Sequence, residues 1–215
     1  MSVDAAVTRS FSAEDFRRRA RGAASAPAAK DDDDFGDHRL NPDMRDQIVR
    51  PGLRDAAVLI PVVDHDEGAT VILTQRTQTM RSHSGQIAFP GGKIDPEDAS
   101  PEHAALREAD EEIGLTDAHV DIIGRLPDYV SGSGFRIAPV LSVVRPGFDL
   151  TINPHEVDAA FEVPLAFLMD PANHRQQSRV WNKRERFFYE MPFGERYIWG
   201  VTAGIIRQLY ERLYA

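Results

Sequence analysis

The segment from Ile72 to Leu115 constrains the fold of this chain more than any other stretch. A run typical of a strand leads into the turn sequence Phe89-Pro90-Gly91-Gly92, and an acidic run typical of a helix follows. Ser100 suits the N-cap of that helix, and Pro101 suits its first position. Gly114 suits the position just after the helix, where the left-handed conformation is common. These residues predict a strand, a glycine turn and a helix in succession.

The predicted helix carries four carboxylates within five residues, at Glu108, Asp110, Glu111 and Glu112. Glu108 and Glu112 are one turn apart and project together, with Glu111 at the edge of the same patch. Like charges at this spacing destabilise a helix by roughly 0.2–0.5 kcal/mol per pair, and the negative helix C-terminus adds to that cost. Arg107 is the only cation in the helix that offsets them. A hard divalent cation, Mg²⁺ or Mn²⁺, would explain the arrangement.

A solvated acidic face is the alternative interpretation of this helix, because most glutamate runs face water. The glycine turn before the helix, together with Arg107 and Gly114 at its sides, favours the metal site. Leu106, Ala109 and Ile113 are spaced three and then four residues apart, so they predict the buried side of the helix.

The composition excludes several classes of protein. With 215 residues the chain fits one domain plus extensions, and 42% hydrophobic residues supply an ordinary core. A net charge of −9 argues against a broad surface for nucleic acid or anionic membranes. The absence of Cys excludes disulfides and thiolate chemistry. We find no apolar run of membrane-spanning length and no secretory signal, and therefore expect a cytoplasmic location.

Residues 1–38 differ from the rest of the chain and are expected to form a flexible N-terminal arm, with the main domain at residues 39–215. Ser12 suits the cap of a short helix through Arg21. The stretch that follows is small and polar, and the acidic run Asp31–Asp34 repels itself. We expect this run to stay solvated, because the spaced ligands and the turn glycine of a calcium loop are missing.

The rest of the chain alternates between strand and helix patterns, which predicts an α/β fold with a mixed sheet between helices. Strands are expected at residues 56–63, 69–75, 85–89, 120–126 and 136–144, with a hairpin at 184–198 that turns at Gly194. Residues 156–169 are expected to be partly helical with Pro164 at a boundary, and residues 202–213 to form the last helix.

The stretch from Gly92 to Leu115 resembles the signature loop and helix of Nudix hydrolases. The second half of that signature matches completely at Arg107–Leu115. The first half departs from it, because Asp98 stands where the signature has Glu, and eight residues then separate it from Arg107. The resemblance implies an α/β/α sandwich and the hydrolysis of a nucleoside diphosphate joined to another group.

An additional motif resembles the branch of the family that hydrolyses coenzyme A. It comprises Ile72–Arg76, Arg81, Gly85 and Phe89–Gly92. Further similarities occur at residues 133–135, 139–140, 162–165 and 198–200, so the resemblance covers roughly residues 50 to 210. It implies that water attacks the pyrophosphate of coenzyme A or a derivative, releasing 4′-phosphopantetheine and adenosine 3′,5′-bisphosphate.

The resemblance also implies roles for individual residues. Glu108, Glu111 and Glu112 are the expected metal ligands, with the Gly92 carbonyl oxygen as a further ligand. Arg107 is expected to orient a ligand carboxylate through a salt bridge, a task that suits a planar guanidinium. Glu111 or Glu112 could also accept the proton of the attacking water.

The proton acceptor could instead come from a later loop, where Glu156 and Glu162 are candidates. Arg76, Arg81 and His83 flank the metal loop and are candidates for phosphate contacts. The aromatic residues between Trp181 and Trp199 could stack on adenine, but packing in a core or a dimer interface is the favoured interpretation.

Two alternative functions stay open from the sequence alone. The same chemistry could act on ADP-ribose, NADH or a dinucleoside polyphosphate, or the chain could be a non-catalytic nucleotide-binding protein of the same fold. The intact acidic helix argues against the non-catalytic alternative. A small-molecule nucleotide is the expected partner, and a homodimer is possible.

Overall fold

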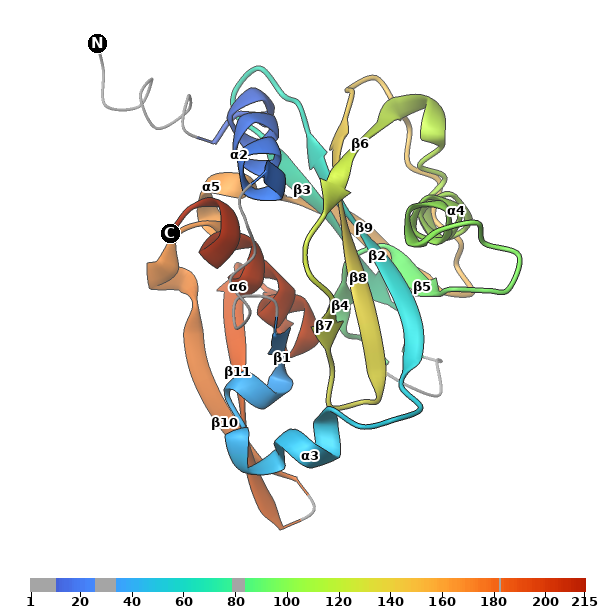
Figure 1. The fold of residues 1–215 in the computed structure, drawn as a ribbon. Coiled ribbons are helices and arrows are strands. Elements are labelled where there is room, and N and C mark those ends of the chain that lie inside the picture. Colours follow the sequence, from blue (N-terminus) through green and yellow to red (C-terminus); the bar gives the residue numbers. More distant parts are fainter. Residues whose placement is uncertain (1–10, 26–33, 79–83, 182) are drawn as a thin grey trace.

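A computed structural model describes residues 11–25, 34–78, 84–181 and 183–215, and places a nine-stranded mixed sheet at the centre of the protein (Figure 1). The long strands β2 (Arg54–Val63) and β8 (Phe135–Val144) are parallel and pair along their whole length. The other strands of this sheet are β1 (Phe35–Gly36), β3 (Thr70–Arg76), β4 (Ile87–Ala88), β5 (Gly91–Lys93), β6 (Val120–Arg125), β7 (Tyr129–Val130) and β9 (Val157–Pro164).

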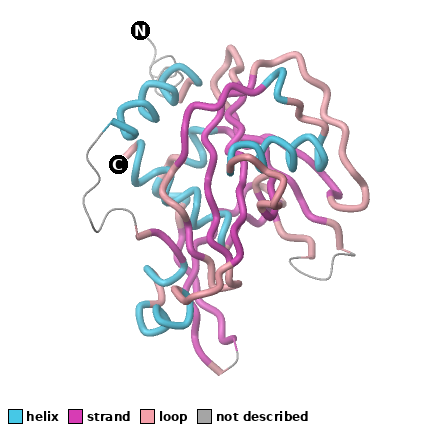
Figure 2. The backbone as a smooth tube through the Cα atoms, turned by 45° about the vertical axis from the view of Figure 1, so that its right-hand side comes forward, coloured by secondary structure: helices cyan, strands magenta, loops and turns pink. Residues whose placement is uncertain are grey.

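Helices cover both faces of the sheet, so the predicted α/β/α sandwich is confirmed (Figures 1 and 2). Helix α4 (Pro101–Ile113) packs on one face, while α2 (Ala13–Ser25) and α6 (Val201–Leu213) pack on the other. Strand β2 serves both cores, since Leu59 lies in the α4 core and Ile60 in the α6 core. A strand buried on both faces explains the continuous apolar run in its sequence.

Helix α4 begins and ends where its sequence predicts. The Ser100 hydroxyl accepts a hydrogen bond from the His103 N–H at 3.2 Å, and Gly114 adopts φ 68°. Ala105, Ala109 and Ile113 are fully buried. Ala104 and Glu112 are buried as well, and Leu106 is partly buried and packs against the same core, so the predicted apolar side faces the sheet.

A second sheet of three antiparallel strands lies beside α6 (Figure 1). It comprises β10 (Arg175–Trp181), β11 (Arg184–Phe193) and β12 (Arg196–Trp199). The predicted hairpin with Gly194 in its turn is confirmed as β11 and β12. Strand β10 was not predicted, because its sequence is mostly polar and lacks the apolar alternation of a half-buried strand. Most of its residues are exposed.

Two predicted elements differ from the structure. Residues 157–164 form strand β9, paired with β3, and only the short helix α5 (Leu165–Leu168) follows. Gly91 and Gly92 belong to strand β5, which pairs with β2, and not to a free turn. In both cases a partner strand that is distant in sequence decides the conformation, and local patterns do not record such a partner.

The predicted N-terminal arm is partly built into the domain. Helix α2 is capped by Ser12 as predicted, and Phe16 on this helix is fully buried. Arg19 donates to the Leu213 carbonyl oxygen at 2.9 Å, which ties α2 to the end of α6. From Ala13 to Ala23 the chain therefore packs against the core, in contrast to the weakly held arm that we expected. Asp31–Asp33 lie outside the described residues.

The remaining short helices are α3 (Arg45–Ile48) and the 3-10 turns η1 (Asp37–Arg39), η2 (Pro42–Met44), η3 (Asp117–His119) and η4 (Pro171–Asn173).

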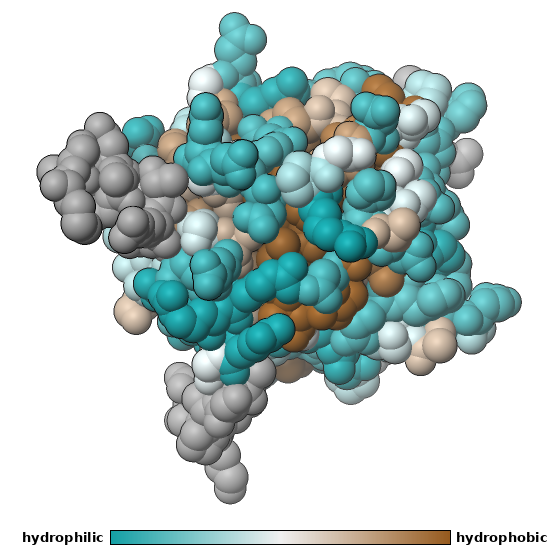
Figure 3. Space-filling view, turned by 90° about the horizontal axis from the view of Figure 1, so that it is seen from above, coloured by the Kyte–Doolittle hydropathy of each residue, from teal (hydrophilic) through white to brown (hydrophobic). Residues whose placement is uncertain are grey.

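Seen from above, most of the surface is hydrophilic, and hydrophobic residues gather near its centre (Figure 3). No helix in the described part of the chain is both long and apolar enough to cross a membrane.

Candidate functional site

A cavity of about 1040 Å³ lies where α4, the edge of the large sheet and the three-stranded sheet meet. The α4 side of its wall contains Glu108 and Glu112, together with the glycines of β5. The opposite wall contains residues of η1, η2 and α3 and of strands β10 and β11. The candidate site is therefore a single space with an acidic wall and a wall supplied by the second sheet.

Glu112 is the most buried of the predicted metal ligands, with 2% of its side chain exposed. Its Oε2 accepts a hydrogen bond from the Gly91 N–H at 3.2 Å, and its Oε1 lies 3.5 Å from Nη1 of Arg76. Burial raises the pKa of Glu112 to about 7, and the nearby charges of Glu108 and Glu156 add to this rise. Arg76 and the Gly91 N–H act in the opposite direction.

Glu108 lies directly against the backbone of Gly92. A Cβ atom added to Gly92 would lie 2.5 Å from the Glu108 Oε2 atom. Burial raises the pKa of Glu108, and Arg107 opposes that rise. The charge of Glu156 raises the pKa of Glu108 as well as that of Glu112, so three carboxylates face the same part of the cavity.

Glu111 is turned differently from the other predicted ligands. Its side chain is 53% exposed and lies outside the cavity wall, 3.2 Å from Nη1 of Arg107. Arg107 also contacts Glu108 Oε1 at 3.0 Å. Glu108, Glu112 and Glu156 thus line one cavity, whereas Glu111 lies on the outer side of the helix.

Asp98 holds Arg107 although it is shorter than the Glu of the signature. Its two oxygens accept hydrogen bonds from Nε and Nη2 of Arg107 at 3.1 and 3.0 Å. Arg107 also donates to the Lys93 carbonyl oxygen at 3.2 Å, which joins α4 to strand β5. The Arg107 guanidinium holds the pKa of Asp98 at about 2, well below its ordinary value, although burial opposes the shift.

We expect the Asp98–Arg107 contact to make stability depend on pH in acid. An acid whose pKa is lowered in the folded state stabilises the fold above its unfolded pKa and loses that effect as pH falls through the folded pKa. Metal-free wild type should therefore exceed Asp98→Asn in free energy of unfolding by on the order of 2 kcal/mol above about pH 4. That gap should narrow between about pH 4 and pH 2, where Asp98 becomes protonated.

Urea unfolding of both proteins across this pH range measures the gap, and a gap that stays constant down to pH 2 would contradict the assignment. Asp95→Asn is the matched control, because Asp95 is largely exposed and lies 3.7 Å from Arg107. An exposed ion pair contributes at most about 1 kcal/mol.

The two glycines of β5 are required for different reasons. A Cβ atom on Gly91 would lie 2.4 Å from the Ala57 carbonyl oxygen and 2.7 Å from the Val58 Cα, both in the backbone of β2. The three atoms nearest to a Cβ atom on Gly92 all belong to the Glu108 carboxylate, which can move. Gly91 therefore permits the close pairing of two strands, whereas Gly92 leaves room for an acidic group.

We expect Gly91→Ala to lower the free energy of unfolding by about 1–3 kcal/mol, as overpacking does in a rigid site. Gly92→Ala should leave stability within about 1 kcal/mol of wild type but displace Glu108 and lower turnover about tenfold or more. Urea unfolding and initial rates of both variants measure the two effects. Equal stability loss in the two variants would contradict the distinction.

Some of the predicted substrate-binding and proton-accepting residues line the cavity, and others do not. Arg76, at the end of β3, lines the cavity beside Glu112, whereas Arg81 and His83 lie outside the described residues. Glu156 also lines the cavity, and its Oε1 accepts from the Asn153 amide at 3.2 Å. Glu162 is directed elsewhere, since its Oε2 lies 2.6 Å from Nε2 of His65 at the β2–β3 turn.

Sequence reasoning missed the basic residues of the opposite wall. Arg54, Arg179 and Arg186 line the cavity, and Phe188 and Trp199 lie among them. The succession of Arg and aromatic residues in strands β10 and β11 was the sequence signal that could have indicated this wall. The predicted packing of the aromatic residues into the core is correct for Tyr189, which packs against the α6 core.

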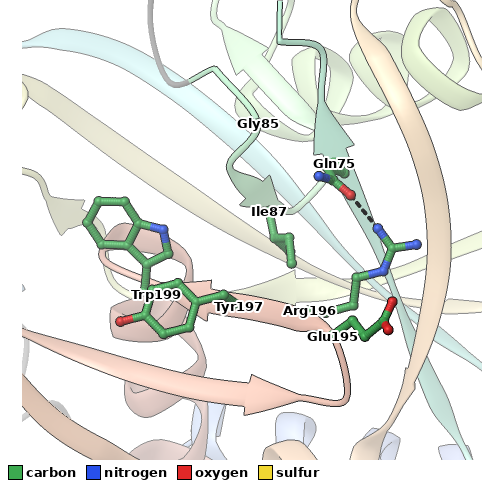
Figure 4. Close-up of a pocket in the computed structure, with 7 residues that line it drawn as sticks. All are labelled: Gln75, Gly85, Ile87, Glu195, Arg196, Tyr197 and Trp199. Atoms are coloured by element: carbon green, nitrogen blue, oxygen red, sulfur yellow. Dashed lines mark hydrogen bonds between the residues drawn. The ribbon is translucent and has the colours of Figure 1, made fainter.

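A smaller pocket of about 440 Å³ adjoins the cavity, and Ile87 and Trp199 line both (Figure 4). Figure 4 shows Arg196 of β12 hydrogen-bonded to Gln75 of β3. The Arg196 guanidinium also lies 4.4 Å from the ring centroid of Phe161 on β9. These contacts attach the three-stranded sheet to the large sheet and so fix one wall of the cavity.

The oxygen donors of the acidic wall suit a hard cation, although they do not surround one common point. Within the described ranges, no three acidic or histidine side chains are close enough together to form a complete metal site. Glu108, Glu112 and Glu156 nevertheless supply only oxygen donors, and the pKa values of Glu108 and Glu112 are raised by burial and by repulsion from neighbouring glutamates. A divalent cation would relieve that repulsion, so these residues fit Mg²⁺ or Mn²⁺.

Comparison with known proteins identifies similar sequences over most of the chain. The NUDIX domain family matches residues 53–185. The uncharacterized Nudix hydrolase NudL of Cronobacter sakazakii is 42% identical over 176 residues, which cover 77% of this chain and 87% of the relative. NudL of Escherichia coli K12 is 41% identical with the same coverage.

Solved structures give weaker matches. The Nudix hydrolase RenU of M. smegmatis is 25% identical, with a TM-score of 0.45, and the match covers 52% of this chain and 70% of RenU. The NUDIX domain of Shewanella oneidensis NrtR, solved with ADP ribose, is 19% identical with a TM-score of 0.49. That match covers 76% of this chain and 90% of the NrtR domain.

Proposed function

Because the chain belongs to the Nudix hydrolase family, whose members cleave pyrophosphate bonds of nucleoside diphosphate derivatives, we propose that it hydrolyses the pyrophosphate of coenzyme A. The products would be 4′-phosphopantetheine and adenosine 3′,5′-bisphosphate. One observation carries the proposal: a single cavity joins an acidic wall to a wall of arginine and aromatic side chains. Such a cavity suits an elongated nucleotide whose pyrophosphate lies at the acidic wall.

Nudix hydrolases generally need divalent metal ions, and this chain offers a set of residues to hold them. We assign Glu108, Glu112 and the Gly92 carbonyl oxygen as ligands of Mg²⁺ or Mn²⁺, and Glu111 as a further ligand that would have to turn from Arg107. When bound, such ions neutralise the charge of the pyrophosphate and lower the pKa of a coordinated water.

The protein's own residues supply the remaining functions. Arg107 orients Glu108, because its guanidinium is held by Asp98 and lies 3.0 Å from Glu108 Oε1. Arg76 lies in the cavity wall beside Glu112, in a position to contact a phosphate oxygen. Glu156 accepts the proton of the attacking water, since it lines the cavity near Glu108 and Glu112 and its charge acts on both. Arg81 and His83 stay candidates for further phosphate contacts.

A substrate panel tests the proposal. Coenzyme A, acetyl-coenzyme A, ADP-ribose, NADH and diadenosine tetraphosphate are compared at equal concentration with Mg²⁺, with Mn²⁺ and with EDTA. Coenzyme A or its acetyl ester should give the highest kcat/KM, and the two expected products should be identified by mass. If ADP-ribose is turned over as fast as coenzyme A, the substrate assignment is wrong. If no substrate is cleaved but nucleotides bind, the chain is a non-catalytic member of the family.

A further inference from the structure

Two arginines lie directly opposite each other on the wall that the second sheet supplies. Arg179 of β10 and Arg186 of β11 are cross-strand partners, and both line the cavity. Like charges in directly opposed positions destabilise a sheet. Arg54, from the start of β2, lines the same cavity. A chain with a net charge of −9 thus gathers three cations around one space.

The protein neutralises these cations only in part: Asp37 attracts Arg186, and Arg179 donates a hydrogen bond to the Tyr197 hydroxyl. Arg54, Arg179 and Arg186 form no ion pair with any residue in the described part of the chain, and the buried Nε of Arg186 has no hydrogen-bond partner there. Asp37 lines the same wall, but its carboxylate already accepts hydrogen bonds from the Tyr129 hydroxyl at 2.7 Å and the Gly132 N–H at 2.6 Å. The arginine wall therefore has unused capacity for an anion.

Aromatic rings accompany the arginines. The Arg179 guanidinium lies 5.3 Å from the ring centroid of Trp199 and 5.7 Å from that of Phe188. The Arg54 guanidinium lies 3.9 Å from the ring centroid of Phe135. Arginines placed over aromatic faces keep their N–H groups available at the edges. The wall thus places phosphate donors beside aromatic side chains.

The wall is held in place from two sides. The buried Asn41 amide donates to the Phe187 carbonyl oxygen at 2.9 Å and accepts from the Phe187 N–H at 2.8 Å. This pair of hydrogen bonds fixes the part of β11 that β12 does not cover to the segment around η2. The Arg196–Gln75 hydrogen bond fixes the end of β12 to the large sheet (Figure 4). A site that is formed before the ligand arrives loses less entropy on binding.

We infer that Arg179 and Arg186 bind a phosphate that the substrate carries outside its pyrophosphate, with Phe188 and Trp199 against the attached base. The inference rests on the proposed function, because in coenzyme A this group is the phosphate at the 3′ position of the adenosine ribose. A phosphate monoester is close to a dianion at neutral pH and accepts bidentate hydrogen bonds from guanidinium groups. The positive charges of Arg179 and Arg186 match that charge, whereas a substrate without the phosphate would leave their repulsion in place.

The comparison of coenzyme A with dephospho-coenzyme A, which lacks only the 3′-phosphate, tests the inference. Wild type should prefer coenzyme A in kcat/KM by about tenfold or more, as expected for a charge-assisted contact. Arg179→Met and Arg186→Met should each remove most of this preference by raising KM for coenzyme A. Both variants should lose much less kcat/KM on dephospho-coenzyme A than on coenzyme A, since methionine retains the apolar stem.

Arg184→Met is the matched control, because Arg184 lies on the same strand two residues from Arg186, is exposed and lies outside the cavity wall. Its preference for coenzyme A should equal that of wild type. Equal rates of wild type on the two substrates, or equal losses on both substrates in the arginine variants, would overturn the inference while leaving the hydrolase proposal intact.

A binding measurement separates this inference from the proposed activity. Isothermal titration calorimetry of the metal-free full chain should show tighter binding of adenosine 3′,5′-bisphosphate than of adenosine 5′-monophosphate. The difference should vanish in the Arg179→Met/Arg186→Met double variant. If no coenzyme A is hydrolysed but this difference is found, the proposed function fails and the phosphate site stands. If the two nucleotides bind wild type equally, the phosphate site is wrong whatever the activity.

Discussion

Replacing Glu112 by Gln is expected to lower the metal-dependent turnover of coenzyme A by about 10²–10³-fold, the range found when a preorganised charge contact of a transition state is lost. The substitution removes the negative charge and keeps the size of the side chain. The amide oxygen of Gln can still accept the hydrogen bond from the Gly91 N–H. Loss of activity should therefore not reflect loss of structure. Initial rates with saturating Mg²⁺, together with circular dichroism, measure both.

The stability of the same variant provides an independent check. An acid whose pKa is raised on folding stabilises the fold only when it is protonated, and this contribution is lost as pH rises through the folded pKa. Because burial raises the pKa of Glu112 to about 7, ionised Glu112 destabilises the metal-free protein above that pH. Metal-free Glu112→Gln should therefore unfold at the same or a higher temperature than wild type at pH 8, and the difference should shrink toward pH 5.

Metal should reverse this order of stability. Ions that bind only the folded state raise the unfolding temperature, so Mg²⁺ or Mn²⁺ should stabilise wild type and have little effect on Glu112→Gln. Asp110→Asn is the matched control, because Asp110 lies in the same acidic run but is exposed and outside the cavity wall. It should keep both activity and the response to metal. A Glu112→Gln variant with wild-type turnover would remove the acidic helix from the mechanism.

The acidic helix was predictable because its signals are local. Ser100, Pro101 and Gly114 mark its ends, and Ala109 and Ile113 mark its buried side, so Glu108 and Glu112 had to project together. The position of Glu111 was not predictable in the same way. It is near the edge of the patch, and whether its side chain turns to the cavity or to Arg107 depends on contacts that helical spacing does not record.

The opposite wall was not predictable from local patterns. Arg179 and Arg186 are brought into one cavity by the pairing of β10 with β11, and β10 lacks the alternation that identifies a strand. Asn41 holds this wall from a segment far away in the sequence. Similarly, strand β9 depends on its pairing with β3. Where a long-range partner decides a conformation, propensity and spacing carry little information.

Glu156→Gln is the second variant from which a large loss of activity is expected, of about 10²-fold or more in kcat, as for removal of a general base. Glu156 precedes β9, and the pairing of β9 with β3 places it across from the acidic helix. The Asn153 amide donates to its Oε1 at 3.2 Å, which leaves Oε2 available to accept a proton. Glu162 was an equal candidate in the sequence, but its carboxylate contacts His65 and Thr70 at the other end of β9.

The response of each variant to metal distinguishes a proton acceptor, as proposed for Glu156, from a metal ligand, as proposed for the α4 glutamates. If Glu156 accepts the proton of the attacking water, Glu156→Gln should keep most of the rise in unfolding temperature that Mg²⁺ produces, while Glu112→Gln loses it. Glu162→Gln is the matched control and should retain wild-type kcat. Equal losses in Glu156→Gln and Glu162→Gln would contradict the assignment, since only Glu156 of the two reaches the cavity.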